Sequence, residues 1–341
     1  MLGLRHTLRI LLKSPAFTVT AIVILAFGIG ANTAVFSLID GVLLRPLPYP
    51  DPNRLVKVVL RAPNSGRTNF DYPDFIDLAA DQRSFDTLCV SDGGDWLDWR
   101  EGDYSTRVNV DFASPGIFRV TGRPLILGRS FTEEEDIPSG PLLIVLSEQF
   151  WRKRFNSDPG VIGKSIVLSG QSFRIIGVSQ SQVDDWGPPP IDAYAPINNI
   201  VTTLNLNLWD RSSHWIDCFG RLKDGINAAQ AEADLGRIYS QVASRYPVTE
   251  QGYVLRIVPL LNAMTEDYHS TIWLLAAAAV GLLAISSVNV GCLLFTRSLE
   301  RRREMVIKAS VGASRRRLIS EVLIETTVLT TTGALVGMVL G

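Results

Sequence analysis

The residues Gly163-Lys164-Ser165 have the types that end a nucleotide-binding P-loop, in which backbone N–H groups surround the phosphates of ATP. The full spacing is G-x-x-x-x-G-K-[S/T], so the loop would have to open with a glycine at position 158. That position holds Asp158, whose carboxylate would repel the phosphates, and Gly160 stands two residues too close. The spacing therefore argues against a nucleotide site. The stretch 164–178 instead predicts two strands joined by a hairpin at 169–171.

Two other stretches carry residues that could bind cations. The segment FTEEEDIPSG, residues 131–140, is acidic but lacks the D-x-D-x-D-G spacing of a calcium loop, so a solvated loop is the favoured interpretation. The segment DWLDWREGDY, residues 95–104, could hold a cationic ligand through Trp96 and Trp99, although hairpin aromatics are the commoner case. No G-x-S-x-G or H-E-x-x-H motif occurs, so the sequence predicts no catalytic site.

Long uncharged stretches determine how these residues are positioned. No charged residue occurs in the 26 positions of 14–39 or in the 27 positions of 270–296. About 20 apolar residues cross a bilayer as a helix, so each stretch predicts a transmembrane span, and both are too long for a secretory signal. A third uncharged stretch, 326–341, would reach about 24 Å at 1.5 Å per residue. We expect it to be the start of a truncated third span.

Charge is sorted along the chain, although the net charge is only −1. Residues 1–39 carry three basic residues and no acid, residues 40–269 carry 22 basic and 30 acidic residues, and residues 297–317 carry eight basic and two acidic residues. Because basic flanks stay in the cytoplasm, the N-terminus and 297–325 are predicted inside, and 40–269 outside. ATP is not available as a fuel outside, which argues again against the P-loop. The low net charge argues against a nucleic-acid partner.

The outer part mixes strand and helix patterns, which predicts an α+β domain. Helical spacing occurs at 147–155 and at 227–246, where Asn227 can cap the helix. Strand-like runs occur at 55–60, 107–111, 142–146, 166–168 and 173–178. The predicted fold class is an integral membrane protein with α-helical transmembrane spans and a large α+β extracytoplasmic domain inserted between spans one and two.

The cysteines leave one question open. Cys89 and Cys218 both fall in the predicted outer domain, where a disulfide can persist, whereas Cys292 lies within a predicted span. Their separation in sequence does not establish a bridge, and a domain of this size folds without one. Unpaired thiols are the favoured interpretation.

The first predicted span contains a cluster of small and polar residues. Gly28, Gly30 and Asn32 indicate a helix-packing face, because small residues let another helix approach and the amide needs a partner in hydrocarbon. The preceding residues 1–13 form either an amphipathic helix on the inner membrane surface or only a basic flank of the span.

The segment after the second span has helix–glycine–helix punctuation that a simple basic loop would not need. Residues 300–311 predict a helix that ends at Gly312, and Ser314 can cap the next helix, which runs into the third span. We call residues 297–325 the elbow.

The elbow sequence ERRREMVIKASVGASRRRLISEVLIET resembles the cytoplasmic coupling segment of MacB/FtsX-type ABC transporter permeases, roughly E-I-G-I-R-x-A-L-G-A-S-R-x-x-I-x-x-x-x-L-x-E. Departures are Val306 for a usual glycine and Ser310-Val311 for Ala-Leu. Residues 8–56 resemble the N-terminal signature of the same family, especially its large acidobacterial-type branch. Residues that fit the coupling pattern are Glu304, Ile307, Lys308, Ala309, Gly312, Ala313, Ser314, Arg315, Ile319, Leu323 and Glu325.

Segments of the outer domain resemble the periplasmic core domain of that family. They are ASPGIFRVTGRPLILGRSF, LSEQFWRKRFNSDPGVIGKSIVLSGQSFRIIGV and GRLKDGINAAQAEADL. Together with the elbow and the N-terminal signature, they extend the resemblance over nearly the whole chain.

The resemblance implies a permease subunit in the bacterial inner membrane, with four spans or eight in a duplicated form. It implies neither catalysis nor a cofactor in this chain. A separate cytoplasmic ABC ATPase would bind the elbow, and closure of that ATPase on nucleotide would move spans one and two and the outer domain for export. Membrane lipid, a periplasmic adaptor protein and a second copy or pseudo-symmetric half are the other implied partners. The implied coupling surface is Glu304, Ile307, Lys308, Gly312, Ala313, Ser314 and Arg315.

Two other classes of protein have the same anchoring. A membrane-anchored extracytoplasmic sensor or receptor would need an output module after the second span, and none precedes residue 341. A membrane-tethered hydrolase would need a nucleophile constellation, which the sequence lacks. The permease is therefore the favoured prediction.

Overall fold

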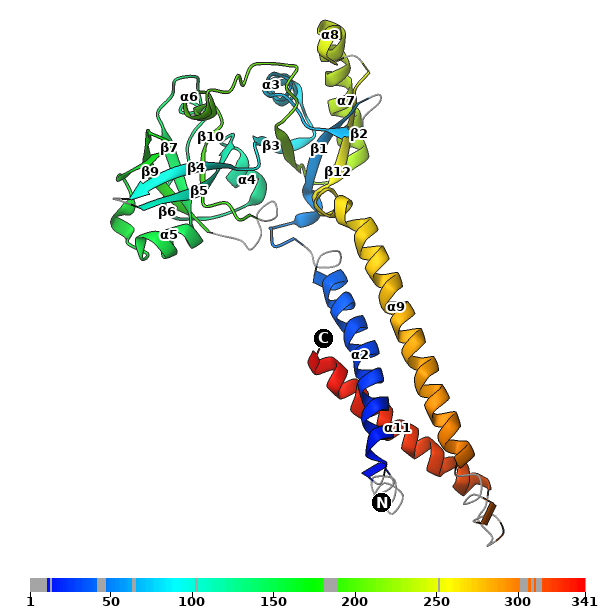
Figure 1. The fold of residues 1–341 in the computed structure, drawn as a ribbon. Helices are drawn as coiled ribbons and strands as arrows, with labels where there is room; N and C mark the ends of the chain where they lie inside the picture. The colour runs from blue at the N-terminus through cyan, green and yellow to red at the C-terminus, as the bar shows by residue number, and fades with distance from the viewer. Residues whose placement is uncertain are drawn as a thin grey trace. The chain divides into compact units, whose positions relative to one another are not determined.

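The structure is a computed structural model of the chain and describes residues 11–12, 14–41, 47–62, 66–101, 104–180, 189–250, 252–300, 306–307, 310 and 315–340. The chain divides into two compact units (Figure 1). The first, here called the α/β unit, comprises Pro46–Met264. The second, here called the helical unit, combines Met1–Arg45 with Thr265–Gly341.

The α/β unit is built on one mixed sheet of twelve strands. Its elements alternate between strands and short helices along the chain, as the α+β prediction requires. The strands are β1 (Leu55–Ala62), β2 (Gly66–Thr68), β3 (Phe85–Ser91), β4 (Asp95–Glu101), β5 (Tyr104–Ala113), β6 (Leu125–Gly128), β7 (Leu143–Ser147), β8 (Ser165–Leu168), β9 (Gln171–Ser179), β10 (Ala193–Pro196), β11 (Asp217–Leu222) and β12 (Val254–Pro259).

Half of the sheet closes on itself. Strand β10 pairs antiparallel with β7 and parallel with β5, so the order β10-β7-β9-β8-β4-β5 returns to β10. Trp99 of β4 opposite Leu168 of β8 joins the circuit. The remaining strands continue from β5 as an open antiparallel sheet in the order β3-β11-β1-β12, with β2 beside β1 and β6 beside β9. Strand β1, the first in the unit, therefore pairs with β12, the last.

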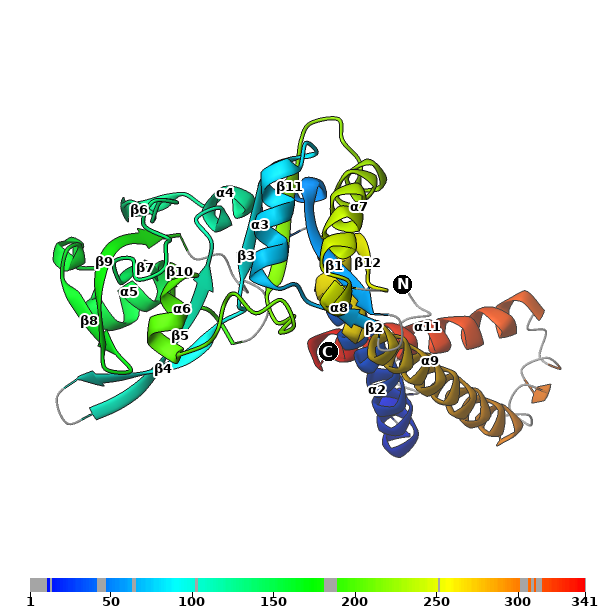
Figure 2. The same ribbon diagram turned by 90° about the horizontal axis from the view of Figure 1, so that it is seen from above.

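Two helices cover the open part of the sheet. Helices α3 (Tyr72–Asp81) and α7 (Ala228–Arg245) lie next to each other, α3 against β3 and α7 against β12 (Figure 2). Helix α7 begins with the predicted cap, because Asn227 and Gln230 form a reciprocal capping box. The other helical segments are η2 (Pro52–Arg54), α4 (Ile117–Thr121), α5 (Glu148–Phe155), η3 (Pro159–Val161), α6 (Asn199–Leu204) and α8 (Pro247–Glu250).

Cys89 and Cys218 are both buried and free. They lie on the adjacent strands β3 and β11, but Cys89 stands opposite Phe219 and Cys218 opposite Val90. Successive residues of a strand point to opposite faces, so the two thiols belong to different hydrophobic clusters, one on each side of the sheet. A disulfide would need both Cβ atoms on one face. The favoured prediction of unpaired thiols is confirmed.

The predicted hairpin at 164–178 is confirmed as β8 and β9, which pair from Leu168 opposite Gln171. Ser169 and Gly170 both have positive φ angles, 47° and 81°, which the tight turn requires. A P-loop would follow a strand and open a helix, whereas Gly163-Lys164 here precede the strand β8. Lys164 Nζ lies 2.9 Å from Asp158 Oδ2, the carboxylate at the position of the missing glycine. The geometry of Gly163-Lys164-Ser165 is therefore not that of a P-loop.

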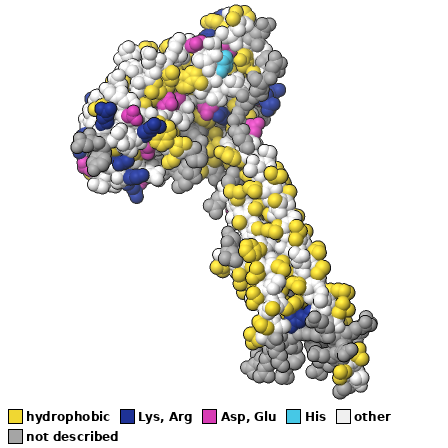
Figure 3. Space-filling model, viewed as in Figure 1, with side chains coloured by type: hydrophobic (Ala, Val, Ile, Leu, Met, Phe, Trp, Pro, Cys, Tyr) yellow, Lys and Arg dark blue, Asp and Glu magenta, His cyan; other side chains and the backbone are white. Residues whose placement is uncertain are grey.

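The helical unit consists of α2 (Pro15–Ile39), most of α9 (Leu260–Glu300) and α11 (Arg315–Leu340). Helix α2 and the segment Tyr268–Leu299 of α9 are long and apolar enough to cross a membrane, and Leu323–Val339 of α11 is a shorter apolar helix. Helix α9 begins ten residues before the predicted span at 270–296. These ten residues include both apolar and polar side chains. Figure 3 shows hydrophobic side chains over the visible face of this unit.

Candidate functional site in the helical unit

The closest helix contact in this unit joins α2 and α11 through glycines. A Cβ atom at Gly30 would lie 3.1 Å from the carbonyl oxygen of Gly337, and a Cβ atom at Gly337 would lie 2.9 Å from that of Ala26. One turn earlier in α11, a Cβ atom at Gly333 would lie 2.7 Å from Leu25 Cβ. Gly333 and Gly337 form a G-x-x-x-G pattern, which lets helix backbones approach in a membrane. No prediction from the sequence included this pattern.

The other small residues of α2 face α9. A Cβ atom at Gly28 would lie 2.7 Å from Ser286 Oγ. Asn32 Nδ2 donates to the carbonyl oxygens of Gly28, at 2.8 Å, and Ala279, at 2.9 Å. The predicted residues Gly28, Gly30 and Asn32 therefore lie on two contacts rather than one. Gly28 and Asn32 contact α9, and Gly30 contacts α11.

The three helices also meet at a charged junction. Arg297 of α9 lies 3.2 Å from Glu325 of α11, measured from Nη2 to Oε1, and their side chains are only 9% and 11% exposed. The guanidinium carbon of Arg297 lies 4.1 Å from the ring centroid of Phe17 of α2, a cation–π contact. We call Phe17, Arg297 and Glu325 the junction. It joins the first basic residue of the elbow to the acid near its end.

Most of the predicted coupling surface lies outside the described residues. Glu304, Lys308, Gly312, Ala313 and Ser314 are among these, and of Arg315 only its helical backbone is described. Ile307 is described as helical and is 63% exposed, beside Val306 at 62%. The described part of the elbow at Val306 and Ile307 thus exposes apolar side chains.

Two candidate sites of the α/β unit have structural roles. Trp99 is buried, stacks on Phe155 and lies under Arg154, so its cation–π partner comes from the chain itself. Trp96 is 49% exposed on the same hairpin. Both tryptophans are therefore aromatic residues of a hairpin, the commoner case, rather than a site for a cationic ligand.

The acidic segment 131–140 is partly solvated, as expected, but not entirely. Asp136 is buried beside a cavity of about 400 Å³ between α3 and the segment 114–119. Its Oδ1 accepts hydrogen bonds from Asn198 N at 2.9 Å and Nδ2 at 3.2 Å. Burial raises the pKa of Asp136 to about 6, and the hydrogen bonds from Asn198 limit the rise. This carboxyl holds the loop in place through its hydrogen bonds from Asn198, a structural role rather than that of a calcium ligand.

Asp136→Asn is expected to raise the thermal stability at pH 7.5 and to leave it unchanged at pH 3.5. The native pKa lies above the ordinary 3.8, so the folded chain binds more protons between these values and loses stability as pH rises through the window. A rise to about 6 corresponds to at most about 3 kcal/mol at 1.36 kcal/mol per pH unit. Asparagine keeps the Oδ1 acceptor and removes the charge. Thermal unfolding at both pH values measures the effect, with exposed Glu134→Gln as control; an equal shift at both would refute the assignment.

Comparison with known families covers most of the chain. The MacB-like periplasmic core domain matches residues 18–238, and the FtsX-like permease C-terminal region matches residues 276–341. The first match begins inside α2 and includes most of the α/β unit. The second begins inside α9 and includes the elbow and α11.

Several proteins are similar in sequence. The macrolide export ATP-binding/permease protein MacB of Hahella chejuensis is 24% identical over 71% of this chain and 36% of its own length. The uncharacterized ABC transporter permease YknZ of Bacillus subtilis is 24% identical over 71% of this chain and 58% of its own length. The chain thus spans about a third of the MacB relative and over half of the YknZ relative.

Solved structures are also similar to part of this chain. The periplasmic region of MacB from Actinobacillus actinomycetemcomitans is 18% identical, with a TM-score of 0.47, over 69% of this chain and 97% of that one. The extracellular domain of YknZ is 16% identical, with a TM-score of 0.45, over 59% of this chain and 98% of that one.

Proposed function

Because this chain belongs to the family that carries the MacB-like periplasmic core domain and the FtsX-like permease region, we propose that it is the membrane subunit through which an ABC ATPase drives export. The ATPase is a separate cytoplasmic protein that docks on the elbow. The proposed docking surface is Glu304, Ile307, Lys308, Gly312, Ala313, Ser314 and Arg315.

The junction is the observation that carries this proposal. It connects the start and the end of the elbow through Arg297 and Glu325, and it connects Arg297 to α2 through Phe17. A displacement of the elbow would therefore act on α2 and α9 together. The covalent chain then leads from the helices to the sheet, because α2 precedes β1 and α9 follows β12. Strands β1 and β12 pair with each other, from Val56 opposite Pro259 to Arg61 opposite Val254.

The membrane arrangement in the proposal follows from charge. The basic residues before α2 and after α9 favour a multi-pass subunit with the N-terminus and the elbow in the cytoplasm and the α/β unit outside. A second copy or a pseudo-symmetric half, and a periplasmic adaptor protein, complete the proposed assembly. Export is the activity class because the name of the MacB relatives states it.

Co-purification tests the docking surface. The full chain is expressed with candidate ABC ATPases from its own genome and isolated from detergent. We expect an ATPase to accompany the parent and to be lost from Glu304→Lys and from Gly312→Pro, since the first reverses a charge and the second breaks the turn between helices. Glu134→Lys makes the same charge reversal on an exposed residue of the α/β unit and should retain the ATPase. Retention by both elbow variants would refute the docking surface.

A further inference from the structure

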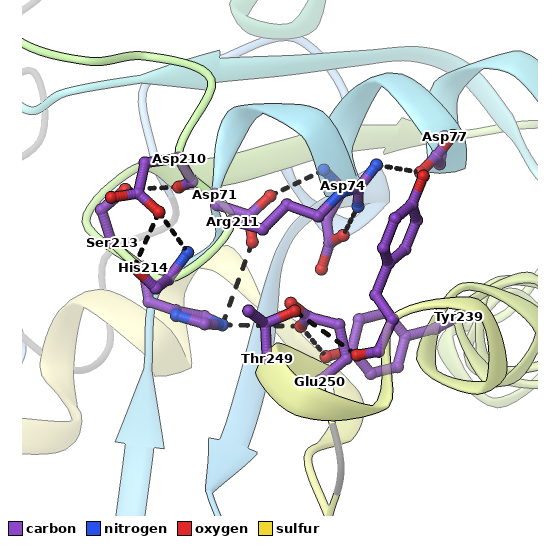
Figure 4. A network of polar contacts seen from close by, with 12 residues as sticks. Asp71, Asp74, Asp77, Asp210, Arg211, Ser213, His214, Tyr239, Thr249 and Glu250 are labelled. Carbon is purple, nitrogen blue, oxygen red and sulfur yellow. Dashed lines mark hydrogen bonds and ion pairs between the residues drawn. The ribbon is translucent and has the colours of Figure 1, made fainter.

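Three side chains from distant segments converge inside the α/β unit (Figure 4). Asp71 precedes α3, His214 lies in the segment between α6 and β11, and Glu250 ends α8. Each offers one ligand atom, and the three atoms lie within 4.8 Å of one another. His214 Nε2 is 4.0 Å from Asp71 Oδ2 and 3.6 Å from Glu250 Oε2.

The carboxylate of Asp71 is fixed through one oxygen and unpaired at the other. Its Oδ1 accepts a hydrogen bond of 2.7 Å from Asp74 N and so caps α3. Its Oδ2 points to His214 and has no hydrogen-bond partner among the described residues, although the side chain is fully buried. Buried polar atoms without a partner are rare because each costs about 1–3 kcal/mol. This oxygen can therefore accept a cation beside His214.

The other two side chains are held in the same way by a surrounding layer. The His214 ring stacks on Tyr253 at 4.9 Å and hydrogen-bonds to the backbone of Ser212. Glu250 is fully buried and accepts a hydrogen bond of 2.8 Å from the Tyr239 hydroxyl. Such outer contacts orient the ligands of metal sites. In Glu250 the oxygen that accepts from Tyr239 is Oε2, the same atom that lies 3.6 Å from His214 Nε2.

The cluster also has more negative than positive charge. Arg211 is engaged by Asp74 and by Asp77, the latter at 2.7 Å, so it neutralises the acids of α3. Asp71 and Glu250 keep His214 as their nearest basic group.

We propose that Asp71, His214 and Glu250 bind a divalent transition-metal ion of the zinc type, with water as the remaining ligand. One imidazole and two carboxylates suit zinc, whereas calcium prefers six to eight oxygens. Tetrahedral ligands at about 2.0 Å from zinc lie about 3.3 Å apart. The separations here, 3.6 Å, 4.0 Å and at most 4.8 Å, would need to close by about 0.3 to 1.5 Å. The ion would join three parts of the chain: the start of α3, the segment between α6 and β11, and the end of α8. Helix α8 is the last helix before β12.

Metal content and thermal stability of the full chain test the site. The chain is purified in detergent with an affinity tag that contains no histidine, and bound metal is removed with EDTA. Separate samples are then incubated with zinc chloride, with calcium chloride or with buffer alone. We expect about one zinc per chain by elemental analysis after gel filtration and a rise in Tm of several degrees with zinc alone. Absence of bound zinc, or an equal response to calcium, would overturn the proposal.

Matched variants distinguish the site from adventitious binding and from misfolding. Asp71→Asn keeps the Oδ1 cap of α3 and Glu250→Gln keeps an acceptor for Tyr239, so both should fold. Glu250→Gln also gives up the ion pair with His214 and should melt below the parent in EDTA. Each should lose the zinc-dependent rise, with affinity lower by roughly 100-fold. His269→Gln removes a histidine of the helical unit and should bind zinc like the parent. Equal zinc binding by the parent and both ligand variants would refute this site, whatever the outcome with ATPases.

Discussion

Glu325→Gln is expected to destabilise the chain in detergent by about 3 kcal/mol, which lowers the unfolding temperature by roughly 6–12 °C. The variant leaves Arg297 without its carboxylate while its side chain is only 9% exposed. Removing one partner of a buried ion pair typically costs about 3–5 kcal/mol, since the remaining charge stays desolvated. The lower end applies because Arg297 retains its cation–π contact with Phe17.

A charge exchange separates the ion pair from other effects at the same positions. Arg297→Glu alone should be at least as harmful as Glu325→Gln, and the double variant Arg297→Glu/Glu325→Arg should recover a large part of the loss. Thr330→Val, on α11 one turn beyond the junction, removes only a hydroxyl bonded to its own helix and should be close to neutral. The measurement is the temperature at which the chain loses its monodisperse gel-filtration peak. No recovery in the double variant would contradict the pair.

Local patterns allowed the elements around these sites to be predicted. The uncharged stretches gave α2 and the apolar centre of α9, since a span needs only composition and length. The alternation around Ser169-Gly170 gave the β8–β9 hairpin, and the spacing after Asn227 gave α7. Each of these depends on residues within about 25 positions of one another, so the sequence alone contains the signal.

The pairings between distant segments could not be predicted in this way. The closure of the sheet through β10 and β5 joins Ala193 to Val110, and no local pattern marks it. The metal cluster combines Asp71, His214 and Glu250, whose separate neighbourhoods read as a helix cap, a loop and a helix end. A single sequence carries no signal for such convergence, because it depends on how the whole sheet is ordered.

Two contacts of the helical unit have a local sequence signal. Glu325 is the only charged residue between 322 and 341, and an isolated acid at the start of an apolar stretch requires a partner, which the structure identifies as Arg297. Gly333 and Gly337 have the four-residue spacing of a helix contact. The prediction from sequence assigns Glu325 to the end of the elbow and the two glycines to the third span, without these contacts.

The glycine contact leads to the second large effect. Gly337→Leu should separate α11 from α2, because its Cβ would lie 2.9 Å from the Ala26 carbonyl and 3.1 Å from Ile29 Cβ. Overpacking usually costs about 1–3 kcal/mol, and a clash with backbone that cannot rotate away should reach or exceed about 3 kcal/mol. Gly281→Leu in α9 is the matched control, because no atom lies within 4 Å of the Cβ position there.

Proximity of the helices can be measured apart from stability. Ala21 of α2 and Leu329 of α11 are buried in one hydrophobic cluster, so Ala21→Cys/Leu329→Cys in a chain without its native cysteines should form an oxidative crosslink. The crosslink should persist with Gly281→Leu and be largely lost with Gly337→Leu. If both leucine variants crosslink equally, the close approach of α2 and α11 at the glycines is wrong. If only Gly337→Leu fails, the G-x-x-x-G contact is what holds α11 against the helix that leads into the α/β unit.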